Sequence, residues 1–323
     1  MRAVASPREA ALALAAGHLA AVPTETVYGL GARTDDPHAI AQIYAAKGRP
    51  ADHPLIAHLA TIEAMNDWGR NIPEYAHQLA KSFWPGPLTL VIPRSPRAGD
   101  FITGSQNSVA VRVSAHPLMQ EVQRILVELT GDPSIAIAAP SANRFGKVSP
   151  TTAQHVLEEL NKFTSAEDVV LDGGECAVGV ESTIIDCTGN NPRLLRPGAI
   201  SVEQVEEITG LPCTTDSQIR ASGTLESHYS PTATVELVDA AALLEPVFAT
   251  ASIGLIALAE HPTPAGMVRL CAPVTREEYA QQLYSALREA DALKLSKVLA
   301  IAPPLGGIGA AILDRLTRAA HPN

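Results

Sequence analysis

Short apolar runs alternate with helix-like segments along almost the whole chain, and this alternation limits the fold more than any other feature. Apolar residues recur at helical spacing in segments such as 39–47 and 117–130, and apolar runs such as 88–92 lie between them. Such alternation is typical of α/β and α+β proteins. Hydrophobic residues form 46% of the 323 residues, which is enough to fill their cores. We therefore expect a globular mixture of helices and strands.

The predicted elements fall into two groups. In the first group we expect helices at 7–18, 39–47, 72–82, 117–130 and 151–160, and strands at 19–22, 55–58, 88–92, 109–113, 135–138, 169–171 and 182–186. After a polar stretch at 214–229, strands at 235–238, 253–257 and 298–301 alternate with helices at 276–293 and 308–319, as in a parallel sheet. The predicted organisation is a large domain at 1–213, a linker at 214–231 and a small α/β domain at 232–323.

Composition excludes several classes of protein. With 24 Lys and Arg against 34 Asp and Glu, the net charge is −10, which argues against a chain that coats nucleic acid by bulk electrostatics. The four cysteines show no C-x-x-C spacing, so we expect reduced thiols in a cytoplasmic protein. The apolar stretch 10–22 is shorter than the ~20 residues of a membrane helix and lacks a preceding basic segment. We expect no membrane association.

Five polar clusters follow the predicted strands and helices. The first, at 23–31, holds two threonines, a carboxylate and a tyrosine, and is either an ordinary capped turn or a ligand loop. The second, at 47–54, holds Lys47 and Arg49, which could clamp phosphate or simply end a helix in solvent. His58 closes the next strand, either as a ligand contact or as a satisfied polar group.

In the third cluster, Arg112 ends an apolar strand and needs an anionic partner, either a structural carboxylate or a substrate carboxylate. The fourth, at 138–143 and 146–150, offers small residues and hydroxyls whose backbone amides could approach an anion, without the Walker pattern. The fifth, at 179–183 and 195–198, adds hydroxyls and Arg196. Gly306 to Gly309 resemble only a fragment of a dinucleotide fingerprint.

Together the clusters supply at least four cations and many hydroxyls, without a covalent nucleophile in an activating setting. This combination favours chemistry at a phosphoryl group through positioning and charge neutralisation.

The motifs resemble, in order, those of the YrdC-type family, the threonylcarbamoyl-AMP synthases. They are PTETVYGLG at 23–31, KGRPADHPL at 47–55, FWPGPLTLV at 83–91, VAVR at 109–112, APSAN and GKVSPT at 139–151, DGG and GVESTI at 172–184, and LRPG at 195–198. HYSP at 228–231 before a small α/β unit resembles the long, two-domain form. The resemblance implies a twisted open α/β sheet with a large concave cavity, plus a small Rossmann-like C-terminal domain.

The family makes threonylcarbamoyl-AMP and pyrophosphate from L-threonine, bicarbonate and ATP. The product passes to a separate transferase that modifies adenosine 37 of tRNAs reading ANN codons. The resemblance therefore implies these substrates, Mg²⁺ accompanying ATP, that transferase as a downstream partner, and no tightly bound metal. Weak RNA binding on the concave surface is also expected.

Position by position, the resemblance implies two sets of contacts. L-threonine contacts fall on Thr26, His58, Arg112, Ala139 and Ser182, and ATP contacts on Arg49, His53, Ser108, Ser141, Ser149, Arg196 and Tyr229. Lys47 and Arg49 are the expected catalytic cations, while Ser141 and Ser149 could donate to phosphate oxygens. His53 stands where the family often has Asn, and 224–227 lack the basic and aromatic residues of the family's linker. A lid over the cavity would then rest on His228 and Tyr229.

Two other functions fit parts of the pattern. A non-catalytic RNA-binding module could use the concave surface alone. A carbamoyl-transfer domain could use carbamoyl phosphate, but such chains usually carry acylphosphatase-like and zinc-finger segments, which neither the length nor the cysteine pattern provides.

Overall fold

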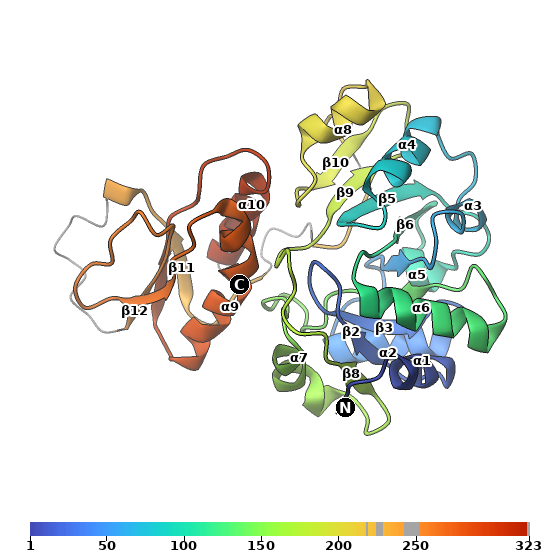
Figure 1. The fold of residues 1–323 in the computed structure, drawn as a ribbon, viewed down its shortest axis with the longest axis horizontal. Coiled ribbons are helices and arrows are strands. Elements are labelled where there is room, and N and C mark those ends of the chain that lie inside the picture. Colours follow the sequence, from blue (N-terminus) through green and yellow to red (C-terminus); the bar gives the residue numbers. More distant parts are fainter. Residues whose placement is uncertain (218, 224–228, 242–251, 322–323) are drawn as a thin grey trace.

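Two β-sheets organise the chain in the computed structural model, which describes residues 1–217, 219–223, 229–241 and 252–321. The larger sheet has ten strands in the order β1-β8-β2-β3-β7-β4-β6-β5-β9-β10, and the smaller has four in the order β11-β14-β12-β13. Figure 1 shows the two sheets in separate parts of the molecule. This architecture confirms the predicted fold class, an α/β sheet protein with a small second α/β unit.

The large sheet is mixed. Neighbours such as β4–β6 and β5–β9 run parallel, whereas β2–β3, β5–β6 and β9–β10 run antiparallel. Its strands are β1 (Arg2–Val4), β2 (Ala20–Val22), β3 (Gly29–Arg33), β4 (Ile56–His58), β5 (Leu88–Pro93), β6 (Ser108–Arg112), β7 (Ile137–Ala138), β8 (Val169–Leu171), β9 (Thr183–Asp186) and β10 (Arg193–Arg196).

Helices accompany this sheet, and local signals set their ends. Asp36 accepts hydrogen bonds from the His38 and Ala39 amides at the start of α2, and Gly48 ends α2 at a left-handed φ of 60°. Pro117 occupies the first turn of α6, and Gly131 ends it in the same way. The helices are α1 (Pro7–Ala15), α2 (Pro37–Lys47), α3 (Met65–Trp68), α4 (Glu74–Phe83), α5 (Asp100–Thr103), α6 (Pro117–Thr130), α7 (Ala153–Leu160), the 3₁₀ helix η1 (Asn161–Phe163) and α8 (Val202–Thr209).

Two apolar clusters pack beside the large sheet. One joins helices α2 and α4 to the strands through Ile43, Leu79 and Leu90, and the other joins α1 and α6 through Leu14 and Leu126. In both clusters apolar side chains pack beneath helices. This packing fixes the strands, and the strands in turn position the loops at their ends.

The small sheet is entirely parallel. It consists of β11 (Thr234–Leu237), β12 (Ile253–Ile256), β13 (Val268–Cys271) and β14 (Lys297–Ala300). Helix α9 (Arg276–Ala292) begins with a capping box between Thr275 and Glu278, and α10 is Gly309–Ala320. Figure 1 shows α9 and α10 on the side of the small sheet that faces the rest of the molecule.

Most predicted elements are confirmed within a few residues, and several further elements appear. Strands β1, β3, β10 and β13 and helices α3, α5 and α8 lie where no element was predicted. The loop predicted at 23–31 is partly wrong, because β3 already begins at Gly29. Thr214, placed in the linker by the sequence, forms a bridge with Arg193 of β10. His228 lies outside the described residues.

Two simpler predictions can also be compared with the structure. All four cysteines are free thiols, and Cys176, Cys187 and Cys271 are buried. Across the described part of the chain, no helix combines the length and apolar character needed to cross a membrane.

Candidate active site

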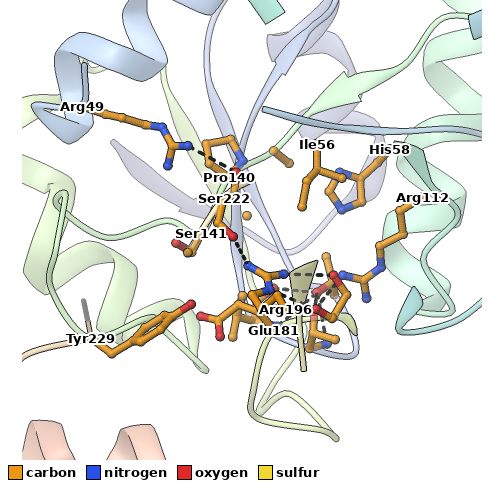
Figure 2. A pocket seen from close by; sticks show the side chains of 17 residues that line it. Arg49, Ile56, His58, Arg112, Pro140, Ser141, Glu181, Arg196, Ser222 and Tyr229 are labelled. Carbon is orange, nitrogen blue, oxygen red and sulfur yellow. Dashed lines mark hydrogen bonds between the residues drawn. The ribbon is translucent and has the colours of Figure 1, made fainter. Parts of the chain in front are cut away.

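A pocket of about 510 Å³, including its mouth, is lined by residues of several strands of the large sheet and by loops at the ends of its strands and helices. Figure 2 shows arginine, histidine, serine and tyrosine side chains around it. Its lining consists of Thr24, Thr26, Val27, Gly29, Arg49, Ile56, His58, Arg112, Ala139, Pro140, Ser141, Glu181, Ser182, Arg196, Ser222, Gly223 and Tyr229. The structure thus brings together nine predicted site residues, from Thr26 to Tyr229.

Arg112 lines the pocket, and each of its three guanidinium nitrogens contacts a protein group. Its Nη2 atom forms a 2.7 Å ion pair with Glu25, Nη1 donates to the Thr26 hydroxyl at 2.9 Å, and Nε donates to the Gly86 carbonyl at 3.2 Å. The sequence left open whether a structural or a substrate carboxylate would partner this arginine. In this structure the partner is structural, namely Glu25, so a contact with the carboxylate of threonine stays a prediction.

Glu25 is a strongly stabilised carboxylate. Burial raises its pKa, but the Arg112 guanidinium and the hydrogen bond from the Ser114 hydroxyl outweigh burial and lower the pKa to about 2. Glu25 is therefore ionised at neutral pH, and its ion pair with Arg112 holds the Arg112 guanidinium in position.

His58 lies beside Arg112 because β4 and β6 are parallel and pair these two residues in register. Burial and the nearby Arg112 charge lower the pKa of His58 to about 3, so its imidazole is neutral at pH 7. The Gln123 side-chain amide of α6 donates to the His58 carbonyl. A neutral imidazole can exchange hydrogen bonds with a hydroxyl group without adding charge to this side of the pocket.

Two further arginines line the part of the pocket around Ser222. Arg49 donates from Nη2 to the Pro54 carbonyl at 3.0 Å and to the Ser222 hydroxyl at 3.2 Å. Arg196 donates to the Ser182 carbonyl and hydroxyl, both at 3.1 Å, and to the Ser222 carbonyl at 2.9 Å. Burial lowers the pKa of Arg49 to about 10 and also lowers that of Arg196. At pH 7 Arg49 still carries its charge, and the two guanidinium groups make this part of the pocket suited to an anion.

Lys47 lies behind the pocket wall rather than in it. Its ammonium donates to the carbonyls of Ser141 and Asn143, each at 2.5 Å, and the side chain is almost completely buried. Burial and, secondly, the charge of Arg49 hold its pKa well below the ordinary value. In this structure Lys47 fixes the 141–143 loop, and direct phosphate binding by Lys47 stays a prediction.

Three other predicted residues also lie outside the lining. Ser108 lines a neighbouring cavity of about 270 Å³, which shares Ser222 with the main pocket. His53 packs edge-on against Phe145, with ring centroids 5.3 Å apart. Ser149 is fully buried and donates its proton to Glu181 at 2.6 Å, so in this arrangement it has no proton to give to phosphate.

Sequence reasoning missed Glu25, Glu181 and Ser222 as members of the site. The two carboxylates stand inside quoted motifs, and each accepts from an arginine far away in sequence, Arg112 for Glu25 and Arg315 for Glu181. An arginine at an apolar position is a signal that such a buried carboxylate exists. Ser222 belongs to a polar stretch without periodicity and gives no comparable signal.

A protein cage for magnesium does not fit the described residues. They contain no group of three or more His, Cys, Asp or Glu side chains that could hold a metal ion. The carboxylate of Glu181, which lines the pocket, already accepts from Ser149, Tyr284 and Arg315. Any magnesium would have to arrive with a ligand that supplies most of its oxygen atoms.

A mixed α/β sheet around a cationic pocket, joined to a small parallel sheet, is the architecture expected of a YrdC-like protein in its long form. Two family models match the chain: one described as "Telomere recombination" over residues 12–198, and one described as "Threonylcarbamoyl-AMP synthase, C-terminal domain" over residues 200–321.

Relatives match over nearly the whole chain. The threonylcarbamoyl-AMP synthase of Pyrococcus abyssi is 41% identical over 94% of this chain and 90% of its own length, and that of Bacillus subtilis is 37% identical over 97% and 92%. The crystal structure of P. abyssi Sua5 complexed with L-threonine superposes with a TM-score of 0.84 at 39% identity, covering 97% of this chain and 94% of that one. The chain belongs to the threonylcarbamoyl-AMP synthase family.

Proposed function

We propose that the protein joins L-threonine, bicarbonate and ATP into threonylcarbamoyl-AMP with release of pyrophosphate. The observation that carries this proposal is the 41% identity to a threonylcarbamoyl-AMP synthase over 94% of the chain. The pocket supports it, because its lining combines the guanidinium groups of Arg49 and Arg196 with Thr26, His58 and Arg112.

In this proposal the two sides of the pocket hold different substrates. Thr26, His58, Arg112, Ala139 and Ser182 bind L-threonine. Arg49, Ser141, Arg196 and Tyr229 bind ATP, with His53, Ser108 and Ser149 nearby, and Lys47 holds the 141–143 loop. Positive charges at Arg49 and Arg196 offset the polyphosphate charge as pyrophosphate leaves.

The reaction then has two steps. Bicarbonate takes up a proton and gives carbon dioxide and water; the threonine amine then adds to the carbon dioxide, forms a carbamate and returns the proton. A carbamate oxygen next attacks the α-phosphorus of ATP, the bond to the bridging oxygen breaks, and pyrophosphate leaves in line. The chain contributes positioning and charge neutralisation, and no residue forms a covalent bond to substrate. Magnesium enters with ATP as part of the substrate, bound to phosphate oxygens.

The product has a reactive mixed anhydride bond, so it needs a consumer that takes the threonylcarbamoyl group. We propose that this consumer is a separate transferase acting on adenosine 37 of tRNAs that read ANN codons. Since ATP and tRNA are intracellular, the proposed place of action is the cytoplasm.

Pyrophosphate release by the purified full chain tests the proposal. We expect release that needs L-threonine, bicarbonate and ATP together, with a new adenylate detected by mass spectrometry. Replacement of L-threonine by L-valine, which lacks the hydroxyl, serves as the control and should reduce turnover. Binding of RNA without any threonine-dependent pyrophosphate release would contradict the proposal and favour a non-catalytic module.

A further inference from the structure

Glu181 is a pocket-lining residue that the second part of the chain contacts from behind. It stands just before β9, lines the pocket, and is only 5% exposed. One carboxylate oxygen accepts from the Ser149 hydroxyl at 2.6 Å. The other accepts from the Tyr284 hydroxyl and from Nε of Arg315, both at 2.8 Å. Tyr284 and Arg315 lie on α9 and α10, so among the described residues the second part of the chain supplies two of the three hydrogen-bond donors to Glu181.

Arg315 is an unusual residue for its position. It occupies the buried stripe of α10, between Ile312 and Leu316, and its side chain has no exposed surface. A guanidinium in such a place is stable only when its charge and its donors are matched. Besides Glu181, it donates to the carbonyl of Pro197, at 3.0 Å, and pairs with Asp314.

The same side chain also contacts the aromatic wall of the pocket. The Arg315 guanidinium lies 5.1 Å from the centre of the Tyr229 ring, and Tyr229 stacks on Tyr284 with centroids 5.6 Å apart. Arg315 therefore touches three segments that line or flank the pocket: the loop of Glu181, the turn after β10, and the residues around Tyr229.

Helix α9 packs directly on the loops that carry these groups. A Cβ atom on Gly179 would lie 2.3 Å from the Cα atom of Gln281, so only glycine allows this approach. Ser285 lies within hydrogen-bond distance of Thr151, at 3.2 Å, and Arg288 donates to the Val148 carbonyl. The close packing fixes the position of α9, and so of Tyr284, against Glu181.

The negative charge of Glu181 affects the arginines that line the pocket. Figure 2 shows the Glu181 carboxylate between Tyr229 and Arg196. Burial raises the pKa of Glu181, but Arg315, then Arg196 and the Ser149 hydrogen bond, lower it to about 2, so this buried carboxylate is ionised. After Arg315, Arg196 is the cation that lowers the pKa of Glu181 most, and it is one of the two proposed polyphosphate ligands. A carboxylate held by Arg196 would compete with phosphate for the same donors.

We propose that Arg315 is a positioning residue of the nucleotide side of the pocket: it holds the Glu181 carboxylate and so leaves Arg196 available to the polyphosphate of ATP. This inference rests on the proposed function, because it needs ATP on this side. The helices of the small α/β unit then help to position the site, although they supply no residue to the pocket lining.

Steady-state kinetics of four full-length variants test the proposal, with ATP varied at saturating threonine. Arg315→Met should raise KM for ATP by roughly tenfold, the scale of one lost charged hydrogen bond. Threonine affinity, measured by calorimetry, should stay near the wild-type value because Arg112 and Glu25 do not contact α10. Arg276→Met is the matched control, since that arginine donates to the carbonyls of Leu305 and Gly306, both in the small unit. It should leave both parameters unchanged.

The other two variants separate charge from packing. Glu181→Gln keeps the shape of the side chain, removes its negative charge and serves as the reference for the double variant. Arg315→Met with Glu181→Gln should have a KM for ATP close to that of Glu181→Gln alone, because no carboxylate remains to occupy Arg196. A loss caused only by the missing bulk of the Arg315 side chain predicts the same tenfold rise in both backgrounds. An unchanged KM in Arg315→Met, an equal loss of threonine binding, or the same rise in both backgrounds would overturn the inference.

Two checks keep the result decisive. If Arg315→Met does not fold, as judged by circular dichroism, Arg315→Gln replaces it, because it keeps donors for the Glu181 carboxylate and removes the positive charge. Its KM for ATP should also rise, and an unchanged KM in this folded variant would overturn the inference. Wild-type protein without threonine-dependent pyrophosphate release would refute the proposed function, and active wild type with an unaffected Arg315→Met would refute only this inference.

Discussion

Glu25→Gln tests how much the buried pair with Arg112 stabilises the larger sheet. The substitution keeps the shape of the side chain and its hydrogen-bond acceptor, but it leaves the Arg112 guanidinium buried without a charge partner. Removing one member of a buried pair costs about 3–5 kcal/mol. The structure yields a similar value independently, because a pKa of about 2 against the ordinary 4.5 corresponds to about 3 kcal/mol at neutral pH.

The pH dependence follows from the direction of this change. Since folding lowers the pKa of Glu25, its contribution is fully present above about pH 4.5 and disappears as the pH falls towards 2. Between pH 7 and pH 3.5, Glu25 alone should account for about 1 kcal/mol of lost stability. Glu25→Gln should therefore be less stable at pH 7, and its stability should fall less steeply on acidification.

Urea unfolding followed by tryptophan fluorescence measures this effect. The two tryptophans, Trp68 and Trp84, are buried and belong to the part of the chain that contains Glu25. Glu207→Gln, which removes an exposed carboxylate on α8, is the control and should keep the wild-type pH slope. If Glu25→Gln matches the wild type in stability at pH 7 and in pH slope, the pair does not stabilise the fold as argued.

Three more substitutions address the pocket and the contact between its two parts. Arg49→Ala should lower turnover by orders of magnitude while the melting curve stays cooperative, and near-normal pyrophosphate release would remove the phosphate assignment. Arg112→Ala should weaken threonine binding and also lower stability, because it leaves Glu25 buried without its charge partner; an unchanged threonine affinity of the folded variant by calorimetry would refute the binding role. Gly179→Ala should lower the melting temperature more than Gly210→Ala does, because both glycines have positive φ but only a Cβ on Gly179 would collide with α9. Equal effects of the two glycine variants would argue against tight packing there.

The sequence predicts best where local signals coincide. Helix α6 and strand β8 occupy their predicted residues, and α6 has a proline at its first turn and a glycine just beyond its end. Strand β3 escapes prediction because Gly29 and Gly31 have little intrinsic preference for strands. Its neighbours require these glycines: a Cβ on Gly31 would lie 2.8 Å from the Ala20 carbonyl oxygen. Tertiary packing, rather than local preference, decides this strand.

In the candidate site, too, local motifs predict some residues, whereas tertiary packing decides others. Motifs in the sequence predict Thr26, Arg49, Arg112 and Arg196, and the fold brings all of them to one pocket. The partners that fix their charges are harder to predict, because they lie far away in sequence or in a different part of the chain. Glu181 and Arg315 are separated by 134 residues, and only the three-dimensional packing of α10 makes them neighbours.

The strand order of the large sheet also sets a sequence of events for a chain emerging from the ribosome. Strands β1 and β2 pair with β8, so Arg2 and Ala20 lie beside Val169. The first strands made must wait for most of that sheet before they find this neighbour, and such non-local pairing slows folding. Helices α9 and α10 are synthesised last. They would pack against loops that are already formed. This packing would complete the hydrogen bonds of Glu181 and would be the last step of folding.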